Sequence, residues 1–509
     1  MNWSGGNDRE GGDTGRLSTR RLYLDTHHEP IVLLHAECPV ARSEGFTARA
    51  QVEIHSGGHV ALATLYLVRD SLIGVHEIGL SEIVWKRLGT IDGSPVTLRH
   101  PKPLRSMSSV RSKVYGHRLG HHALDEILRD IVADRYSDVE LAAFVTAFSS
   151  QPPEVAEIVA LTRAMVDVGD RLSWPNAVVV DKHSVGGIPA NRTTPIVVSI
   201  AASAGLVIPK TSSRAITSPA GTADAMETMA PIDLDTSAMR RVVEREGGCI
   251  VWGGSVRLSP ADDILIGVER ALDLDSSSQL IASVLSKKAA AGSTHVLLDL
   301  PVGPTAKVRS NEDAAELSIL IEEVASELGL RVRIVQTDGA QPVGRGVGPA
   351  LEARDVLAVL RQDHDAPPDL RARSLYLSAA LLELAGAAAP GLGARLAEEI
   401  LVDGRALKKF MSICEAQGGF REPPTADLSR EIGAPRGGQV ASIDNRLLAR
   451  IAKLAGAPGA KAAGLELHVR TGDLVDRGQP VMTLHAQSRG EMAYALAFAR
   501  ANPQTIAIL

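Results

Sequence analysis

The chain has 509 residues, of which 45% are hydrophobic and 22% charged, and its formal net charge at pH 7 is −6. These proportions are typical of a soluble globular protein, and the length predicts several domains with more than one core. The net negative charge excludes the basic footprint of a nucleic-acid-binding protein. The three cysteines, Cys38, Cys249 and Cys414, form no C-x-x-C pair. Their spacing argues against a disulfide framework or a zinc site and favours a reducing cytoplasm.

Residues 1–20 are rich in Gly, Asp, Arg and Ser and contain no apolar stretch, so neither a signal peptide nor a membrane anchor is predicted. We expect a disordered tail there. The longest apolar run, residues 195–209, is bracketed by prolines and interrupted by Ser199 and Ser203. It is too short to span a bilayer and predicts a buried helix, so no membrane association is expected.

Residues 21–100 alternate polar and apolar side chains, most clearly at 51–55 and 61–67. Gly57 and Gly58 separate these two runs and mark a turn. The pattern predicts a small β-rich N-terminal domain.

A helical domain is predicted for part of residues 101–175, after a proline-rich link at 101–104. Ser137 and Glu140 have the spacing of a capping box, which marks the start of a helix. The apolar residues of that helix recur at helical spacing: Leu141, Phe144, Val145 and Phe148.

Residues 176–430 are predicted to form a parallel α/β domain. Strand-like runs at 178–180, 296–300 and 332–335 alternate with helical segments. In such a sheet the ligand loops lie at the carboxyl ends of the strands.

Residues 437–509 contain a glycine-punctuated alternating pattern at 464–481 that resembles the barrel-sandwich hammerhead of biotinyl and lipoyl carriers. The tip has no lysine to be modified. We therefore expect a barrel-sandwich-like structural or assembly module, which makes the whole chain a multidomain α/β protein.

A first loop of small residues, 181–194, lies between a strand-like run and a helix-like run. The free N–H groups and the positive end of the helix dipole at such a turn favour a dianion. Glycines allow the backbone to approach closely, while a lysine and hydroxyls supply charge and donors. The residues concerned are Lys182, Ser184, Gly186, Gly187 and Thr193.

A second loop, 210–224, repeats this composition about thirty residues later, with one arginine, Arg214, among hydroxyl side chains. These are Ser212, Ser213, Thr217, Ser218 and Thr222. Each loop alone could be an ordinary turn, and neither fits the dinucleotide or P-loop motif. Together they could hold two phosphates, or one phosphate and one sugar.

The two loops, in this order, resemble the signature of the thymidine and pyrimidine-nucleoside phosphorylases, and more closely that of their longer relatives, the AMP phosphorylases. The resemblance runs from about residue 20 to the end of the chain. The segments that carry it are 181–187, 213–227, 247–254, 260–263, 283–288 and 341–344.

The resemblance implies phosphorolysis, in which inorganic phosphate attacks C1′ and displaces the base. The implied phosphate-holding residues are Lys182, Ser184, Thr193 (or its neighbour Thr194), Ser212 and Thr222. His183, Ser283 and Lys287 correspond to positions near the sugar and base. The remaining substrate contacts implied are Gly187, Ser213, Arg214, Ala215, Ile216, Thr217, Ser218, Thr222 and Lys307.

The resemblance assigns Asp275, Lys182 and His183 to catalysis, with Asp275 donating a proton to the leaving base. Burial that raises the pKa of a carboxylic acid suits that role. From the sequence alone the role of helix N-cap would be preferred for Asp275, and only the resemblance favours the proton donor. Lys307 and Arg214 are candidates for binding a 5′-phosphate, although Lys307 could be a surface lysine at a strand edge.

One departure favours the AMP enzymes over the thymidine enzymes. Seven residues before Asp275, where the thymidine enzymes carry an arginine that contacts the pyrimidine edge, this chain has Val268, which cannot replace a bidentate donor. We expect cleavage of AMP to adenine and ribose 1,5-bisphosphate. The alternatives are thymidine phosphorolysis and, in another class, a non-catalytic nucleotide or sugar-phosphate sensor.

The expected partners are a nucleotide or nucleoside, inorganic phosphate as co-substrate, and a second copy of the chain in a homodimer or larger homo-oligomer. No metal, other cofactor, nucleic acid or membrane is expected. The composition and the three separate cysteines favour the cytoplasm.

Overall fold

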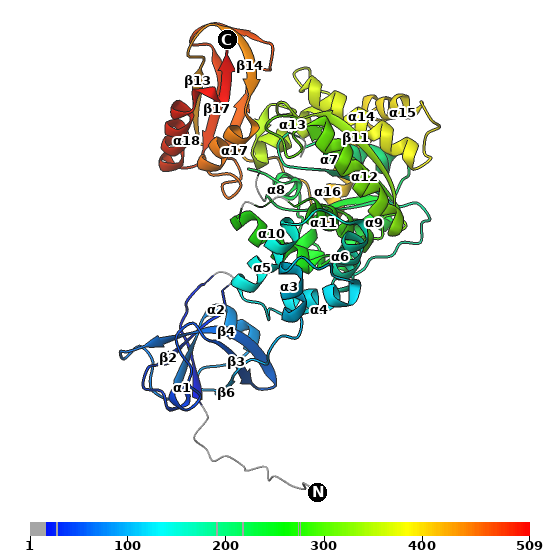
Figure 1. Cartoon of the computed structure of the whole chain (residues 1–509). Coiled ribbons are helices and arrows are strands. Elements are labelled where there is room, and N and C mark those ends of the chain that lie inside the picture. The colour runs from blue at the N-terminus through cyan, green and yellow to red at the C-terminus, as the bar shows by residue number, and fades with distance from the viewer. Residues whose placement is uncertain (1–16, 27–28, 190–191, 216–217, 273, 275) are drawn as a thin grey trace. The chain divides into compact units, whose positions relative to one another are not determined.

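The computed structural model describes residues 17–26, 29–189, 192–215, 218–272, 274 and 276–509 (Figure 1). The chain divides into two compact units, Met1–Arg105 with Ala133–Arg135, and Ser106–Val132 with Tyr136–Leu509. Each unit has its own hydrophobic core. We describe each by itself.

The N-terminal unit is a closed barrel with strand order β1-β5-β2-β4-β3-β6. Alternate side chains point inward, as Val52 and Ile54 do, and fill the core. Its elements are β1 (Leu17–Arg21), β2 (Ile31–His35), α1 (Pro39–Ser43), β3 (Gln51–Ser56), β4 (His59–Val68), β5 (Glu77–Leu80), α2 (Glu82–Leu88) and β6 (Pro95–Arg99).

The prediction of a disordered tail over residues 1–20 is wrong at its end, since β1 begins at Leu17. Leu17 is buried, and β1 pairs with both β5 and β6 to close the barrel. These pairing partners lie far along the chain, so local composition carried no sign of them. Residues 1–16 lie outside the described part of the chain.

The larger unit begins with a helical bundle made of two separate segments of the chain. Its helices are α3 (Met107–Val114), α4 (His121–Val132), α5 (Asp138–Ser149), α6 (Val155–Asp167), α10 (Pro260–Leu272) and α11 (Ser277–Ala290). The predicted capping box is present, with the Glu140 N–H donating to Ser137 Oγ at 3.4 Å. Helices α10 and α11 pack on α5 and α6, so the bundle is completed by residues well beyond 175.

The α/β part contains a parallel sheet with strand order β11-β10-β7 and a parallel pair, β8-β9. The strands are β7 (Val180–Ser184), β8 (Ile208–Ser212), β9 (Gly248–Trp252), β10 (His295–Val302) and β11 (Arg331–Asp338). The helices are α7 (Thr193–Ser203), α8 (Thr222–Glu227), α9 (Thr236–Glu246), η1 (Gly253–Val256), α12 (Asn311–Glu327), α13 (Pro349–Arg361), α14 (Pro368–Leu384), α15 (Gly393–Val402) and α16 (Arg405–Gln417).

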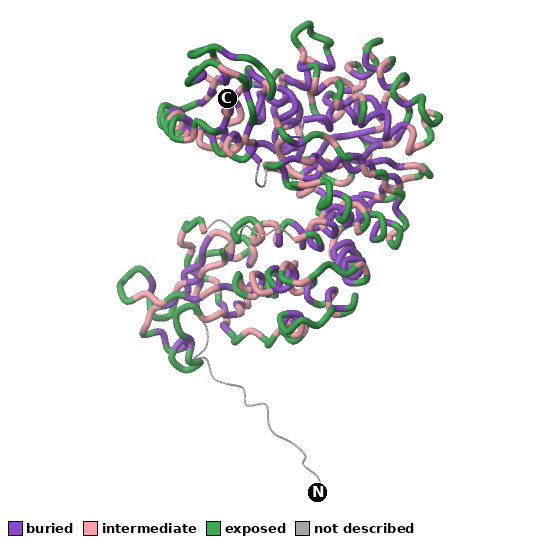
Figure 2. The backbone as a smooth tube through the Cα atoms, turned by 45° about the horizontal axis from the view of Figure 1, so that its top comes forward, coloured by how far each residue is buried: buried purple, intermediate pink, exposed green. Residues whose placement is uncertain are grey.

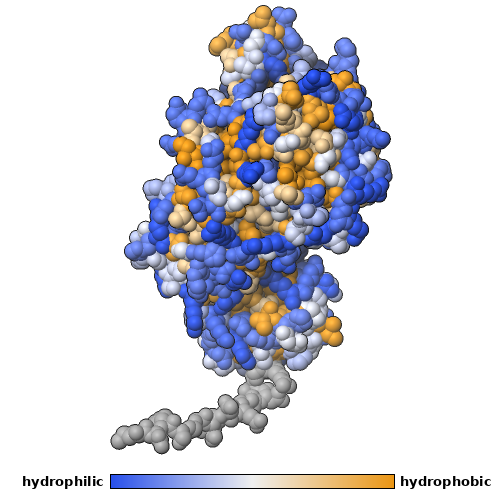
Figure 3. Space-filling view, turned by 90° about the vertical axis from the view of Figure 1, so that its right-hand side faces the viewer, coloured by the Kyte–Doolittle hydropathy of each residue, from blue (hydrophilic) through white to orange (hydrophobic). Residues whose placement is uncertain are grey.

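Both faces of this sheet are covered, which explains its continuous apolar strands. Leu297 points into a core shared with α7, α13 and α14, while Val296 and Leu298 point into one shared with α6, α11 and α12. The buried tube in Figure 2 is concentrated in this α/β part. On the face shown in Figure 3, hydrophilic side chains are spread widely with hydrophobic ones between them, as is normal for a protein surface.

Strand β7 continues further than the sequence predicted. Lys182, His183 and Ser184 are strand residues rather than loop residues, because they pair in register with Leu297, Leu298 and Asp299 of β10. Polar residues at the end of a strand do not produce the apolar pattern used to detect one.

The C-terminal domain contains two small antiparallel sheets and two helices. Its elements are β13 (Leu428–Gly433), β14 (Gly438–Ile443), α17 (Asn445–Leu454), β15 (Gly464–Leu467), β16 (Leu474–Val475), β17 (Pro480–Ala486), α18 (Arg489–Ala501), η2 (Pro503–Thr505) and β18 (Ile506–Ile508). One sheet has the order β12-β15-β17-β13, in which β12 (Gly346–Val347) comes from the α/β part. This domain therefore begins before residue 437, since β13 pairs along β17.

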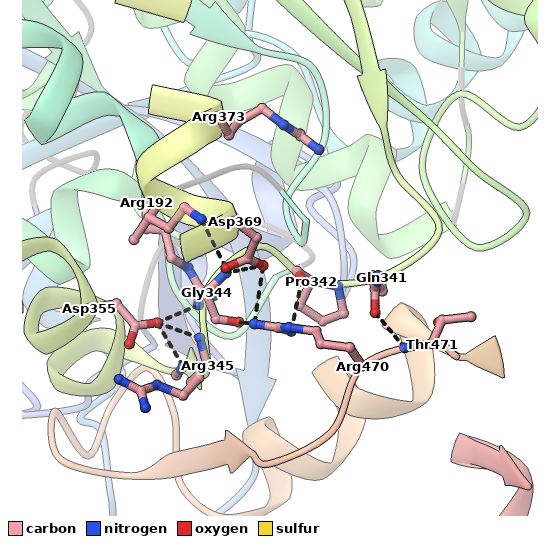
Figure 4. A network of polar contacts seen from close by, with 12 residues as sticks. Arg192, Gln341, Pro342, Gly344, Arg345, Asp355, Asp369, Arg373, Arg470 and Thr471 are labelled. Atoms are coloured by element: carbon pink, nitrogen blue, oxygen red, sulfur yellow. Dashed lines mark hydrogen bonds and ion pairs between the residues drawn. The ribbon is translucent and has the colours of Figure 1, made fainter. Parts of the chain in front are cut away.

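Polar contacts join the C-terminal domain to the segment that precedes β12 (Figure 4). The Arg470 guanidinium donates to the carbonyls of Pro342 (3.2 Å) and Gly344 (2.6 Å) and lies 3.1 Å from an Asp369 carboxylate oxygen. Gly344 has φ of +77°, and a Cβ there would lie 2.6 Å from Asp355 Oδ2. The turn therefore requires glycine.

Arg470→Ala is expected to lower the free energy of unfolding by about 2 kcal/mol, because it leaves two half-buried carbonyls and a carboxylate without their charged donor. Urea denaturation monitored by circular dichroism would measure this. Arg430→Ala in the same domain is the matched control, because the Arg430 guanidinium contacts only the neighbouring Ser429 carbonyl among described residues. Equal unfolding midpoints for the two variants would show that the Arg470 contacts do not stabilise the fold.

Candidate active site

A cavity of about 690 Å³ opens at the carboxyl end of β7. Its walls come from the two small-residue loops, from α10 and α11 of the helical bundle, from the segment 305–309 and from α17 of the C-terminal domain. This volume lies within the range of small-molecule sites in proteins. The cavity therefore joins all three parts of the larger unit.

The base of the cavity contains a lysine surrounded by hydroxyl groups. Lys182 is fully buried, and its Nζ donates to Ser184 Oγ (2.5 Å), Thr193 Oγ1 (2.6 Å) and Thr194 Oγ1 (3.4 Å). Burial lowers the pKa of Lys182 to about 8. The structure thus brings together the first three residues predicted to hold phosphate. Thr193 makes the shorter contact with Lys182, whereas Thr194 is the one of the two threonines that lines the cavity.

Asp299, which was not identified from the sequence, orients the hydroxyl of Ser184 beside Lys182. Its carboxylate accepts from Ser184 Oγ (2.8 Å) and Thr337 Oγ1 (2.5 Å), and Arg373 in turn donates to Thr337 (2.9 Å). An aspartate inside the apolar run of β10 was the available signal, because a buried carboxylate needs partners.

A buried ion-pair group lies beside Lys182. Asp181, which is completely buried, sits 3.3 Å from Lys210 Nζ and 2.8 Å from Lys288 Nζ. Burial lowers the pKa of Lys210 to about 7. Burial and the surrounding lysines also lower the pKa of His183 well below 6.5, so this imidazole is neutral at pH 7. No sequence pattern pairs residues this far apart, so the group was not predicted.

The two loops meet where glycine is required. A Cβ on Gly187 would lie 2.5 Å from Ser218 Cβ, so only glycine permits this approach. Five predicted residues of the second loop line the cavity: Ser212, Ser213, Arg214, Ser218 and Thr222. Ala215 is not among the lining residues, although its N–H donates to Asp224 (2.6 Å). Ile216 and Thr217 lie outside the described residues.

Arg214 lines the cavity but is surrounded by carboxylates. Its guanidinium donates to both Glu227 oxygens at 2.8 and 2.9 Å, approaches Asp224 and Asp233, and stacks 4.9 Å over the Trp252 ring. Lys461 of the C-terminal domain also contacts Glu227, at 2.5 Å. Much of the arginine's charge is therefore offset within the protein.

Ser283 and Lys287, which the resemblance places near the sugar and base, line the cavity from the helical side. Lys287 pairs with the buried Asp262. Asp263, which the sequence reasoning missed, also lines the cavity, and burial raises its pKa to about 6. Asp275 lies outside the described residues, while its neighbours Leu274 and Ser276 line the cavity.

Another arginine, Arg270, lies on the same helix as Val268 and lines the cavity. On α10 the cavity is lined by Ile266, Glu269 and Arg270, and Val268 is not among its lining residues. The guanidinium that Val268 lacks is thus present two residues later. Val268 alone therefore does not exclude a pyrimidine.

Lys307 lies above the first loop at the cavity wall. Its Cβ is 3.2 Å from the place a Cβ would occupy on Gly186, where φ is +95°. Lys307, the candidate for binding a 5′-phosphate, therefore lies beside the first loop, which also contains Lys182.

The described residues contain no group of three or more His, Cys, Asp or Glu arranged to hold a metal ion. Within the same part of the chain, no helix is long and apolar enough to cross a membrane.

Family comparisons agree with this arrangement. Residues 176–407 match the glycosyl transferase family a/b domain, 108–169 its helical bundle domain, and 439–505 the pyrimidine nucleoside phosphorylase C-terminal domain. Relatives named "Putative thymidine phosphorylase" are 58% identical in Polaromonas sp. strain JS666 (97% of both chains), 59% in Sphingopyxis alaskensis (96% of this chain, 95% of that) and 58% in Chelativorans sp. strain BNC1 (95% of both).

The chain belongs to the thymidine and pyrimidine-nucleoside phosphorylase family. The fold alone is also similar to anthranilate phosphoribosyltransferase from Thermus thermophilus, with TM-score 0.50, 21% identity, and coverage of 61% of this chain and 99% of that chain.

Membership confirms three predictions. The protein is a multidomain α/β phosphorylase, it is a pentosyltransferase, and its substrates are a nucleoside-class molecule and phosphate. The alternative of a non-catalytic sensor on this fold is not supported.

Proposed function

We propose that this phosphorylase cleaves nucleoside 5′-monophosphates, converting AMP and phosphate into adenine and ribose 1,5-bisphosphate. The observation that supports the proposal is that two clusters of hydroxyl and cationic side chains line one cavity. The cluster of hydroxyl side chains around Lys182 suits the attacking phosphate, while Lys307 and the second-loop hydroxyls of Ser213 and Ser218 suit a second phosphate on the sugar.

In the proposed reaction a phosphate oxygen forms a bond to C1′ while the bond from C1′ to the base breaks. Charge builds up on the sugar as an oxocarbenium ion, which a closely held phosphate dianion stabilises. Lys182, Ser184 and Thr193 hold that dianion in position, and this positioning itself accelerates the step. The leaving purine takes a proton from a carboxylic acid, the role proposed for Asp275.

Thymidine phosphorolysis is the second candidate. Arg270 lines the cavity and could donate to a pyrimidine edge, as an arginine does in the thymidine enzymes.

The deciding experiment incubates the enzyme and phosphate with a panel of nucleosides and 5′-monophosphates and follows base release by chromatography. Adenine and ribose 1,5-bisphosphate from AMP are the expected products. Release of thymine from thymidine, with no base released from any monophosphate, would assign the second candidate instead.

Asp275→Asn is expected to slow base release from AMP by about 10²-fold while leaving AMP binding largely intact, because the amide keeps the shape and removes the proton. Single-turnover rates and calorimetric binding would measure the two effects separately. Asp263→Asn is the matched comparison, since Asp263 is the described acid in this cavity with a raised pKa. If only Asp263→Asn slows the reaction, Asp263 is the proton donor.

A further inference from the structure

Helix α17 of the C-terminal domain forms part of the active-site wall. Arg446, Arg450 and Lys453 on this helix line the cavity, whereas Leu448 and Ile451 are buried in the domain's own core. The helix is amphipathic, with one face inside the C-terminal domain and its cationic face toward the cavity.

The start of α17 is fixed beside the phosphate-binding loop. The Asn445 amide donates to Thr305 Oγ1 (3.1 Å) and to the Gly339 carbonyl (2.9 Å), and Asn445 is almost fully buried. Thr305 is two residues from Lys307, which lies over Gly186 of the first loop. The cations of α17 thus extend outward from Lys307.

Five cations at this rim lack a counter-charge within the described part of the chain. They are Arg270, Arg309, Arg446, Arg450 and Lys453, and among the described residues none of their side chains has an ion pair or hydrogen bond. The interior cations differ, since Lys288 and Lys287 are paired with Asp181 and Asp262. The rim is thus a concentration of positive charge.

Lys453 lies close enough to Arg270 and Arg450 for the three cations to repel one another. Burial, followed by the nearby charges of Arg270 and Arg450, lowers the pKa of Lys453. Arg270 comes from the helical bundle, whereas Arg450 and Lys453 come from the C-terminal domain. An anion between them would relieve this repulsion, and the excess of cations at this cavity edge attracts such an ion even with Glu269 beside Arg270.

We propose that this cationic rim binds the 5′-phosphate of the substrate, so that the C-terminal domain selects phosphorylated over unphosphorylated nucleosides. The inference rests on the proposed function. It adds a charge source that neither loop supplies: Arg214 is offset by Glu227, Asp224 and Asp233, and Lys182 is committed to the attacking phosphate.

The test compares AMP and adenosine binding, measured by calorimetry without inorganic phosphate, in the wild type and in the triple variant Arg446→Gln, Arg450→Gln, Lys453→Gln. The wild type should bind AMP more tightly. Each of the three cations facing a phosphate is expected to contribute roughly 3- to 5-fold, so the ratio of the adenosine to the AMP dissociation constant should fall by about 50-fold in the variant. The preference of the wild type for AMP over adenosine should decrease as salt is added.

Arg500→Gln on α18 is the matched control, because Arg500 is exposed in the same domain and does not line the cavity. Thermal unfolding should be alike for wild type, control and triple variant, since the substituted side chains lie outside the core. A control that loses AMP selectivity to the same extent would show a general charge effect and overturn the proposal.

Three further outcomes overturn the proposal. The wild type could bind AMP and adenosine equally, the ratio of their dissociation constants could be unchanged in the triple variant, or the variant could bind both ligands more weakly to the same extent. Turnover separates this from the proposed function. If the wild type binds AMP through the rim but releases no adenine, the rim stands and AMP phosphorolysis fails. If adenine is released from AMP and the ratio of dissociation constants is the same in the triple variant, AMP phosphorolysis stands and the rim proposal fails.

Discussion

Catalytic efficiency with AMP is expected to exceed that with thymidine by roughly 10⁴-fold. A cavity built for a 5′-phosphate leaves its cations without their anion when an unphosphorylated nucleoside binds, and unmatched polar groups discriminate by about that factor. In this cavity the α17 cations Arg446, Arg450 and Lys453 are expected to supply about 50-fold of this factor, and Lys307 with the hydroxyls of the second loop the rest.

Initial rates of base release at saturating phosphate would measure this difference. Adenosine and thymidine 5′-monophosphate complete the comparison, because they separate the effect of the phosphate from that of the base. The phosphate should account for most of the difference. Comparable efficiency with thymidine and AMP would move the assignment to thymidine phosphorylase, with Arg270 as the group to test for pyrimidine contact.

Lys182→Ala is expected to lower turnover by about 10³-fold, because it removes the cation that opposes the attacking phosphate in a buried site. Lys182→Met preserves most of the side-chain volume, so a similar loss in this variant would show that charge rather than packing is responsible. Lys408→Ala is the control, since Lys408 lies on α16 and is not among the residues that line the cavity. A near-normal rate for either Lys182 variant at low phosphate would refute the assignment.

The same lysine predicts a pH dependence. Because the pKa of Lys182 is lowered to about 8, the ammonium is charged below that pH and loses its proton as the pH rises through 8. Phosphate binding should therefore weaken between pH 7 and 9. The pH profile of kcat/KM for phosphate would show the decrease, and Lys182→Met should remove that part of it.

The local features of the fold could be predicted because they depend on neighbouring residues. The Ser137–Glu140 capping box and the apolar strand at 296–300 both appear where the sequence placed them. The two loops meet through Gly187 and Ser218, as two cooperating anion loops would require.

The features that could not be predicted depend on long-range pairing. Asp181 meets Lys288 and Glu227 meets Lys461 only after sheet and domain assembly, and no periodicity links such positions. Asp299 was overlooked because its neighbours gave β10 the appearance of a purely structural strand. Helix α17 was assigned to an assembly module, yet it lines the cavity.

Strand β12 has a consequence for dividing the protein. It donates two residues, Gly346 and Val347, to the antiparallel edge of β15 in the C-terminal sheet. A fragment cut at residue 437 would lose both β12 and β13. The outer edge of β15 and the outer edge of β17 would then carry unsatisfied backbone groups, which favours aggregation. In the remaining N-terminal fragment, β12 would lack its pairing partner β15. The C-terminal domain is thus not an interchangeable cassette, and grafting it onto another phosphorylase requires moving residues 341–348 with it.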